Sequence, residues 1–230
     1  MEMLNLSTAA FIGVFTALFP IINPLGGAPI FFNMVQGCSP AVRNQLAKTI
    51  SINCFSMLFV SMLVGPQLLL FFGISLSALK LAGGVVLISM GWSLLNQKST
   101  SDKNASNESG ITDTTASSNA FFPLTMPLTA GPGVMASAIA LVAGSKHSEG
   151  FNFANSMPSI IGALLGLLAL SITVYFSYRE ASSLQRLLGP NGTNVLMRLF
   201  SFILLAIGVQ VFLGGLEGFA GQVYKELAVR

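Results

Sequence analysis

Charged side chains are scarce in this sequence: Asp, Glu, Lys and Arg together make up only 8% of its 230 residues. A soluble globular domain carries roughly 25% of such residues, so this chain lacks the polar surface that contact with water requires. Hydrophobic residues make up 53% of the chain, and the mean hydropathy is +0.74. These proportions exclude a soluble domain and indicate an integral membrane protein.

The few charges leave long stretches of the chain uninterrupted. Six stretches contain no Asp, Glu, Lys or Arg: 3–42, 49–79, 81–97, 114–145, 150–178 and 199–216. About 20 apolar residues cross the hydrocarbon core as a helix, whereas barrel strands alternate over about 10 residues. The expected fold class is therefore all-α integral membrane, with six transmembrane helices. We place them near 8–35, 49–72, 76–95, 120–144, 157–178 and 195–219.

Cysteine and intramembrane carboxylates are also lacking. Cys38 and Cys54 are too few for a disulfide framework and have no metal-ligand spacing. Hard cations prefer carboxylate oxygens, and the acidic residues fall in loops and at the ends of spans, so we expect no metal and no cofactor. Hydrolase, zinc-protease and P-loop motifs are absent, which argues against an enzyme. The basic residues are too dispersed to predict nucleic acid as a partner.

One long polar segment divides the chain. Residues 96–119 are rich in Ser, Thr, Asn and Asp and predict a flexible linker. On this basis residues 1–95 form a first three-helix repeat and residues 120–230 a second one.

The two halves resemble each other. The stretch "FPIINPLGGAPI" (19–30) aligns without a gap to "FPLTMPLTAGPG" (122–133). The aligned prolines are Pro20 with Pro123, Pro24 with Pro127, and Pro29 with Pro132. Three spans per repeat is an odd number, so the second repeat enters the membrane from the opposite side. The sequence therefore predicts an inverted-topology pair, which is common among secondary transporters.

The distribution of Lys and Arg gives an orientation. These residues are more frequent in loop 36–48, the linker and loop 179–198 than in the other loops and the termini. The positive-inside rule then places the linker in the cytoplasm and both termini outside, in a multi-pass protein of the cell membrane.

Paired prolines and glycines predict a break in the first helix and in the fourth. Helix should be lost between Pro24 and Pro29 and between Pro127 and Pro132, and a second half-helix should begin near Pro29 and near Pro132. Such freed backbone is tolerated only inside protein or beside water. The two half-helix N-termini should converge near the midplane, where their N–H groups favour a carboxylate. Carbonyl groups around Asn23 and Thr125 are suited to an ammonium group, so a small zwitterion fits this site.

The candidate substrate-binding residues are those at the two breaks. They are Asn23, Pro24, Leu25, Gly26, Gly27, Ala28, Thr125, Thr129, Ala130, Gly131, Pro132 and Gly133.

The motifs "NPLGGAPIF" and "PLTAGPG", in a six-span chain with a polar middle loop, resemble the MarC family of membrane proteins. The resemblance covers nearly the whole chain. It implies kinship with LysE-type exporters and, through the SnatA-like branch, transport of small neutral amino acids such as glycine and alanine. It also implies that 23–28 and 129–133 line the substrate site.

Other functions stay open at this stage. The leading hypothesis is a secondary transporter for small neutral amino acids that works by alternating access. A channel or exporter for another small solute and a non-transporting membrane scaffold are the alternatives. Membrane lipid is the other expected partner, and the small-residue pair Gly162 and Gly166 is consistent with close packing inside the monomer or with a homo-oligomer.

Overall fold

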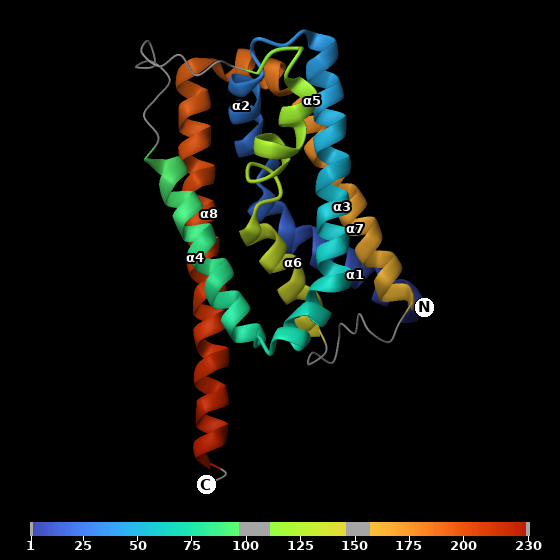
Figure 1. Cartoon of the computed structure of the whole chain (residues 1–230), viewed down its shortest axis with the longest axis vertical. Coiled ribbons are helices and arrows are strands. Elements are labelled where there is room, and N and C mark those ends of the chain that lie inside the picture. The colour runs from blue at the N-terminus through green and yellow to red at the C-terminus, as the bar shows by residue number, and fades with distance from the viewer. Residues whose placement is uncertain (1, 97–110, 146–156, 229–230) are drawn as a thin grey trace.

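The computed structural model describes residues 2–96, 111–145 and 157–228, and these residues form helices with no strand among them (Figure 1). Five of the described helices are long and apolar enough to cross a membrane: Leu4–Ile22, Pro40–Phe72, Leu76–Leu95, Met157–Arg179 and Asn191–Tyr224. Large apolar side chains on their outer faces are exposed, including Leu70, Phe71 and Phe202. Because lipid tails can cover such faces, the chain is a multi-pass integral membrane protein.

The first predicted span consists of two helices, α1 (Glu2–Ile22) and α2 (Pro24–Met34). The break lies at Asn23 and not between Pro24 and Pro29, so the predicted position was wrong. Asn23 adopts a left-handed backbone conformation, with φ 51° and ψ 59°, which ends α1. Pro24 then starts α2, because the first helical position needs no N–H donor. Pro29 lies inside α2, where only one backbone hydrogen bond is lost.

The fourth predicted span is broken where the sequence indicates. It begins with a short α5 (Ala116–Asn119) and a π-helical turn, η2 (Ala120–Thr125). Residues 126–131 are not helical, and α6 (Pro132–Ser145) follows. With 14 residues, α6 is too short to cross the membrane alone. This is why the described residues contain five long spans rather than six.

The other four predicted spans fall within four helices. They are α3 (Pro40–Phe72), α4 (Leu76–Leu95), α7 (Met157–Arg179) and α8 (Ala181–Ala228). Helix α3 starts earlier than predicted because the Ser39 hydroxyl accepts a hydrogen bond from the Val42 N–H, at 3.4 Å, and so caps it. Helix α8 is bent at Gly189, whose φ of 65° only glycine adopts readily.

The predicted flexible linker is ordered at its C-terminal end. Residues 97–110 lie outside the described part, but Ile111 is buried and its N–H donates to the Met34 carbonyl at 3.2 Å. The Asp113 carboxylate accepts a hydrogen bond from the Ser39 N–H at 2.8 Å. Burial raises the pKa of the Cys38 thiol, and this thiol donates to the Ile111 carbonyl at 3.2 Å. One buried apolar side chain and three hydrogen bonds therefore fix this part of the linker against the α2–α3 connection.

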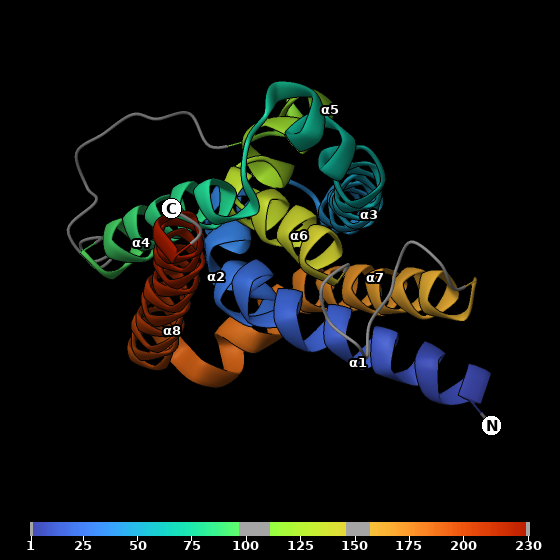
Figure 2. The same ribbon diagram turned by 90° about the horizontal axis from the view of Figure 1, so that it is seen from below.

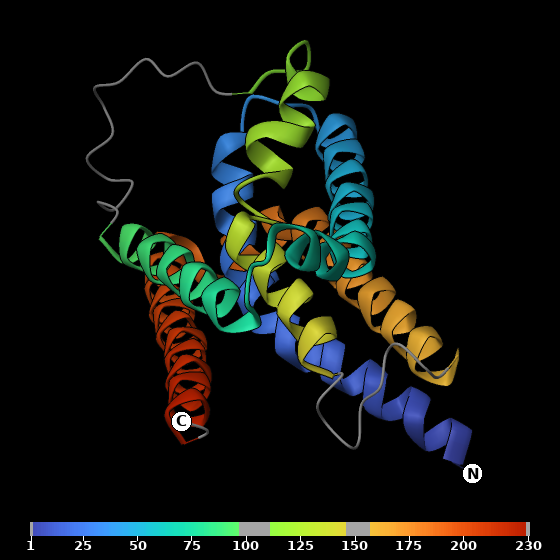
Figure 3. The same ribbon diagram turned by 60° about the horizontal axis from the view of Figure 1, so that its bottom comes forward.

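The helices surround a centre formed by α2 and α6, the second halves of the two broken spans. Seen from below, α2 and α6 lie in the middle, α4 and α8 lie together on one side, and α1 and α7 lie together on another (Figure 2). A third view shows α6 descending between α4 and α7 (Figure 3). In Figure 1, α1 and α2 rise from the N-terminus towards the top, whereas η2 and α6 descend. The broken spans therefore run in opposite directions through the molecule.

Glycines allow the outer helices to approach closely. A Cβ atom at Gly84 of α4 would lie only 2.6 Å from the Phe212 backbone nitrogen of α8. A Cβ atom at Gly162 of α7 would overlap the Ser7 carbonyl oxygen of α1. Of the two alternatives left open for Gly162, the structure therefore shows close helix–helix packing within the monomer.

Candidate functional site

The first break satisfies most of its own backbone groups. The Asn23 side chain accepts a hydrogen bond from the Gly26 N–H at 3.1 Å, and the Asn23 carbonyl accepts one from the Gly27 N–H at 2.9 Å. Asn23 is buried, with 9% of its surface exposed, so this N-cap is made inside the protein. The N-terminus of α2 is therefore largely closed to an external anion, contrary to the sequence-based expectation of two equivalent open ends.

The second break leaves donors free. Within it, the Thr129 and Ala130 N–H groups both donate to the Thr125 carbonyl, at 3.0 and 2.9 Å. Helix α6 begins after Gly131, which has no side chain to act as a cap. In the described part of the chain, the N–H groups of Gly133 and Val134 have no hydrogen-bond partner. The second break therefore presents bare donors and the positive end of a helix dipole.

A small cavity of about 30 Å³ lies between the two breaks. The first break contributes Asn23, Gly26 and Gly27 to its wall, and the second contributes Leu128 and Thr129. Helices α4 and α8 close the cavity with the side chains of Leu87, Met90, Met197, Ser201 and Leu204, among others. A water molecule needs at least about 10–15 Å³, so in this conformation the cavity has room for water but not for an amino acid.

The structure divides the candidate residues into two groups. Asn23, Gly26, Gly27 and Thr129 line the cavity. The others lie beside it without lining it: Pro24, Leu25, Ala28, Thr125, Ala130, Gly131, Pro132 and Gly133. Leu25 is partly exposed, and a Cβ atom at Gly133 would lie 2.6 Å from the Leu87 side chain, so Gly133 serves close packing on α4.

Tyr178 of α7 connects the two breaks, and the sequence reasoning missed it. Its side chain is buried, with 2% exposed, and its hydroxyl lies 2.8 Å from Thr129 Oγ1. Because Thr129 uses its own hydroxyl hydrogen on the Leu124 carbonyl, at 2.9 Å, Tyr178 must be the donor of their shared bond. The same hydroxyl is 2.9 Å from the position that a Cβ atom at Gly27 would take. Only glycine at position 27 leaves room for this arrangement.

Thr125, at the start of the second break, is also fixed by hydrogen bonds of its hydroxyl group. Its hydroxyl donates to the Ala120 carbonyl at 2.7 Å and accepts from the Asn53 side-chain amide of α3 at 3.3 Å. The bond from Asn53 therefore joins α3 to η2. Thr125 therefore anchors the second break to α3 rather than facing the cavity.

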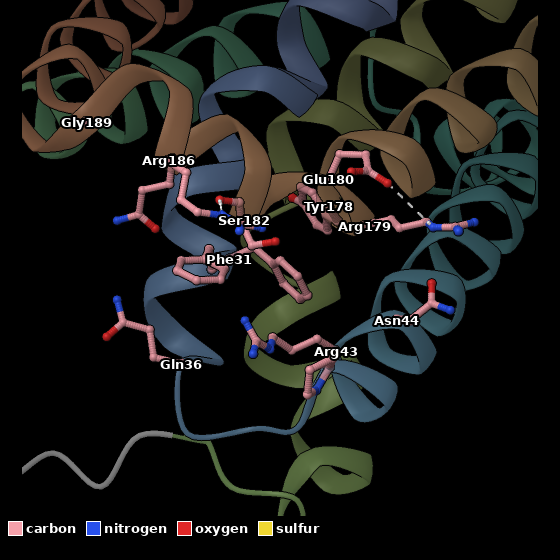
Figure 4. A pocket seen from close by; sticks show the side chains of 13 residues that line it. Phe31, Gln36, Arg43, Asn44, Tyr178, Arg179, Glu180, Ser182, Arg186 and Gly189 are labelled. Carbon is pink, nitrogen blue, oxygen red and sulfur yellow. Dashed lines mark hydrogen bonds and ion pairs between the residues drawn. The ribbon is translucent and has the colours of Figure 1, made fainter.

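Two larger hollows flank the cavity at opposite ends. One, of about 1050 Å³, lies beside the start of α3 and the α7–α8 connection (Figure 4). Phe31 and Tyr178 separate it from the cavity: their rings stack with centroids 4.7 Å apart and an interplanar angle of 9°. The other hollow, of about 630 Å³, lies between α1, α6 and α8, and Ile21 lines both it and the cavity. Each hollow is thus closed off from the centre by one or two side chains.

Metal ligands do not gather in the described ranges. No group of three or more His, Cys, Asp or Glu residues lies there in a position to hold a metal ion. The polar groups at the cavity are hydroxyls, one carboxamide and backbone amides. This set binds by hydrogen bonding and dipoles.

Known proteins match this chain over nearly its whole length. A family model described as MarC family integral membrane protein matches residues 8–220. The chain is 31% identical over 216 residues to an inner membrane protein MarC of Citrobacter koseri, covering 93% of this chain and 96% of the relative. It is 30% identical over 211 residues to membrane protein PH0760 of Pyrococcus horikoshii, covering 92% of this chain and 96% of that relative. It is 29% identical over 204 residues to membrane protein YhcE of Escherichia coli K12, covering 89% of this chain and 90% of that relative. No solved structure matches it significantly.

Proposed function

Because the chain belongs to the MarC family of integral membrane proteins, we propose that it is a secondary transporter of small neutral amino acids. The observation that carries this proposal is the cavity between the two breaks, which is lined by Gly26 and Gly27 from one break and by Thr129 from the other. Transporter sites of this kind form where discontinuous helices meet near the midplane.

The chemistry of the cavity suits a small zwitterion. The free N–H group of Val134, a residue that lines the cavity, lies at the positive end of α6, which favours a carboxylate. The hydroxyl of Thr129 and the carbonyl groups of the interrupted backbone can accept bonds from an ammonium group. The cavity is small even though two glycines of α2 line it, so glycine and alanine fit this description better than larger amino acids.

We also propose that the chain is an inverted repeat. The opposite directions of α1–α2 and η2–α6 support this. So do the helix contacts, which occur in matching pairs: α2 packs on α8 as α6 packs on α4, and α2 packs on α7 as α6 packs on α3. Exchanging the two halves reproduces these contacts, as a pseudo-two-fold axis would require. The predicted unit boundaries, 1–95 and 120–230, are compatible with these pairs.

The arrangement of the hollows supports alternating access as the mechanism. The present conformation is closed at both ends, by Phe31 and Tyr178 on one side and by Ile21 on the other. Admitting an amino acid therefore requires one of these closures to open. Movement of α2 against α7 would open the first of them, because Phe31 and Tyr178 belong to these two helices. The basic residues around the larger hollow support a cytoplasmic location for that side and an outer location for both termini.

Uptake of labelled glycine and alanine into proteoliposomes tests the proposal directly. We expect saturable uptake or exchange that is competed by unlabelled alanine. Solute flux that never saturates would instead support a channel. No flux and no exchange under any imposed ion gradient would support a non-transporting scaffold, and the proposal would be rejected.

A further inference from the structure

The hollow of about 1050 Å³ beside the start of α3 is strongly cationic, and we call it the vestibule. Three arginines line it, Arg43, Arg179 and Arg186, together with one acidic residue, Glu180. Arg43 comes from α3 and Arg186 from the first turns of α8, whereas Arg179 ends α7 and Glu180 lies between α7 and α8. In Figure 4 the side chains of Arg43 and Arg186 reach towards Phe31 from different elements, while Arg179 lies farther off beside Asn44.

The charges within the vestibule do not neutralise each other. Glu180 pairs with Arg179 at 3.7 Å, and this pair is the one salt bridge among the described residues. Both side chains are about half exposed, at 48% and 59%, so the pair is held loosely. Arg179 also donates to the Tyr175 hydroxyl at 3.2 Å. Arg43 and Arg186 are left without an acidic partner in the described part of the chain.

Arg43 carries an unpaired buried donor in the wall of the vestibule. Its guanidinium lies over the Phe32 ring, 5.3 Å from the centroid. Its Nε–H group is buried and has no hydrogen-bond partner among the described residues. A buried donor on a charged group is costly to leave unpaired, and an oxyanion would satisfy both its charge and its hydrogen bond.

Arg186 also lines the vestibule, and its guanidinium has N–H donors that are not used in other hydrogen bonds. Its Nε–H makes only a long contact, 3.4 Å, to the Ser182 carbonyl, so the two terminal nitrogens of its guanidinium remain for a ligand. Guanidinium groups recognise carboxylate and phosphate oxygens through paired, charge-assisted hydrogen bonds. Two such groups from separate elements around one hollow are suited to clamp a single anionic group.

We propose that the vestibule is a binding site for an oxyanion, a phosphate or carboxylate group, held by Arg43 and Arg186. This site is separate from the cavity at the helix breaks, because the stacked Phe31 and Tyr178 rings lie between them. The anion can come from a lipid headgroup or from a free solute, since both present the same oxygen atoms. The proposal does not depend on which amino acid the protein transports, or on whether it transports one.

Thermal unfolding of the purified full-length protein tests the site with two probes. The first is inorganic phosphate in a neutral detergent, compared with chloride at the same ionic strength. The second is a phosphatidylglycerol nanodisc, compared with a phosphatidylcholine nanodisc. We expect at least one probe to raise the unfolding midpoint. A rise with phosphate identifies a soluble anion as ligand, and a rise only with phosphatidylglycerol identifies a lipid headgroup.

Arg43→Gln and Arg186→Gln should each weaken the apparent affinity for the effective probe at least about tenfold, because each removes a charged hydrogen bond. Lys48→Gln is the matched control: it removes one exposed positive charge from the same end of α3 but does not line the vestibule. If Arg43→Gln does not fold, Arg186→Gln, whose side chain is exposed, still tests the clamp. The proposal is overturned if neither probe stabilises the wild type, or if Lys48→Gln weakens binding as much as the two arginine variants do.

Discussion

The Tyr178 hydroxyl donates a hydrogen bond to Thr129 Oγ1 across 2.8 Å. The same hydroxyl sits against the backbone of Gly27, so one side chain of α7 touches both interrupted spans. Its ring stacks on Phe31 of α2, and these two rings separate the vestibule from the central cavity. Tyr178 therefore both holds the two breaks together and forms part of the closure that must move for a solute to enter.

Tyr178→Phe tests the hydrogen bond alone. The variant keeps the ring that stacks on Phe31 but leaves the Thr129 oxygen without its donor. We expect the free energy of unfolding to fall by about 1 kcal/mol, as for loss of a typical buried hydrogen bond. Thermal unfolding in detergent measures this. The matched control Tyr224→Phe, at a position 76% exposed on α8, should change it by less than about 0.5 kcal/mol. Equal effects of the two variants would show that the Thr129 bond contributes nothing.

Gly27→Ala tests the space in front of Tyr178. The added Cβ atom would lie 2.9 Å from the Tyr178 hydroxyl oxygen, which is too close, so the buried ring must shift and break its bond to Thr129. We expect glycine uptake to fall at least about tenfold, equivalent to about 1.4 kcal/mol of lost interaction. Gly221→Ala is the control, because nothing lies within 4 Å of its Cβ position. Normal uptake by Gly27→Ala would remove Gly27 and Tyr178 from the transport site.

The spans and the second break could be predicted from sequence because their signals are local. Charge-free runs determine where a chain can cross the membrane, and Pro132 after Gly131 marks the start of α6. The first break was predicted too late in the chain. The decisive feature is the left-handed conformation of Asn23, a residue type that tolerates it, and the pair Asn23-Pro24 was the available signal.

The role of Tyr178 could not be predicted from its own neighbourhood. It lies at the end of an apolar run before Arg179, where an anchor at the membrane surface would be the ordinary interpretation. Its function arises from residues 49 and 151 positions away, Thr129 and Gly27, which only the fold brings together. The vestibule could not be predicted from the sequence either, because Arg43 and Arg186 come from different halves of the chain. Distant pairings of this kind leave no periodic pattern in a single sequence.

Asn23 offers a test of the first break with its own internal comparison. Asn23→Gly loses the side-chain cap on Gly26 but keeps easy access to φ 51°, so it should cost only a few tenths of a kcal/mol. Asn23→Ala loses the cap and also forces a left-handed conformation on alanine, for a total of about 2 kcal/mol. The unfolding midpoint should therefore fall in the order wild type, Gly, Ala. An alanine variant at least as stable as the glycine variant would contradict the left-handed break.

Gly84→Ala tests whether the contact between α4 and α8 depends on bare backbone. The new Cβ atom would lie 2.6–2.7 Å from the Phe212 backbone, which cannot rotate away, so the two helices must separate. Overpacking of this kind typically costs about 1–3 kcal/mol. The unfolding midpoint should fall accordingly.

Gly214→Ala is the matched control for Gly84→Ala. It makes the same substitution on α8, where nothing lies within 4 Å of the Cβ position. Because alanine is the better helix former, this variant should be neutral or up to about 1 kcal/mol more stable than the wild type. Equal stability of the two variants would mean that α4 and α8 are free to move apart. In that case the part of the cavity wall that Leu87 and Leu204 form would itself move. It would then not be the rigid surface against which α2 and α6 open.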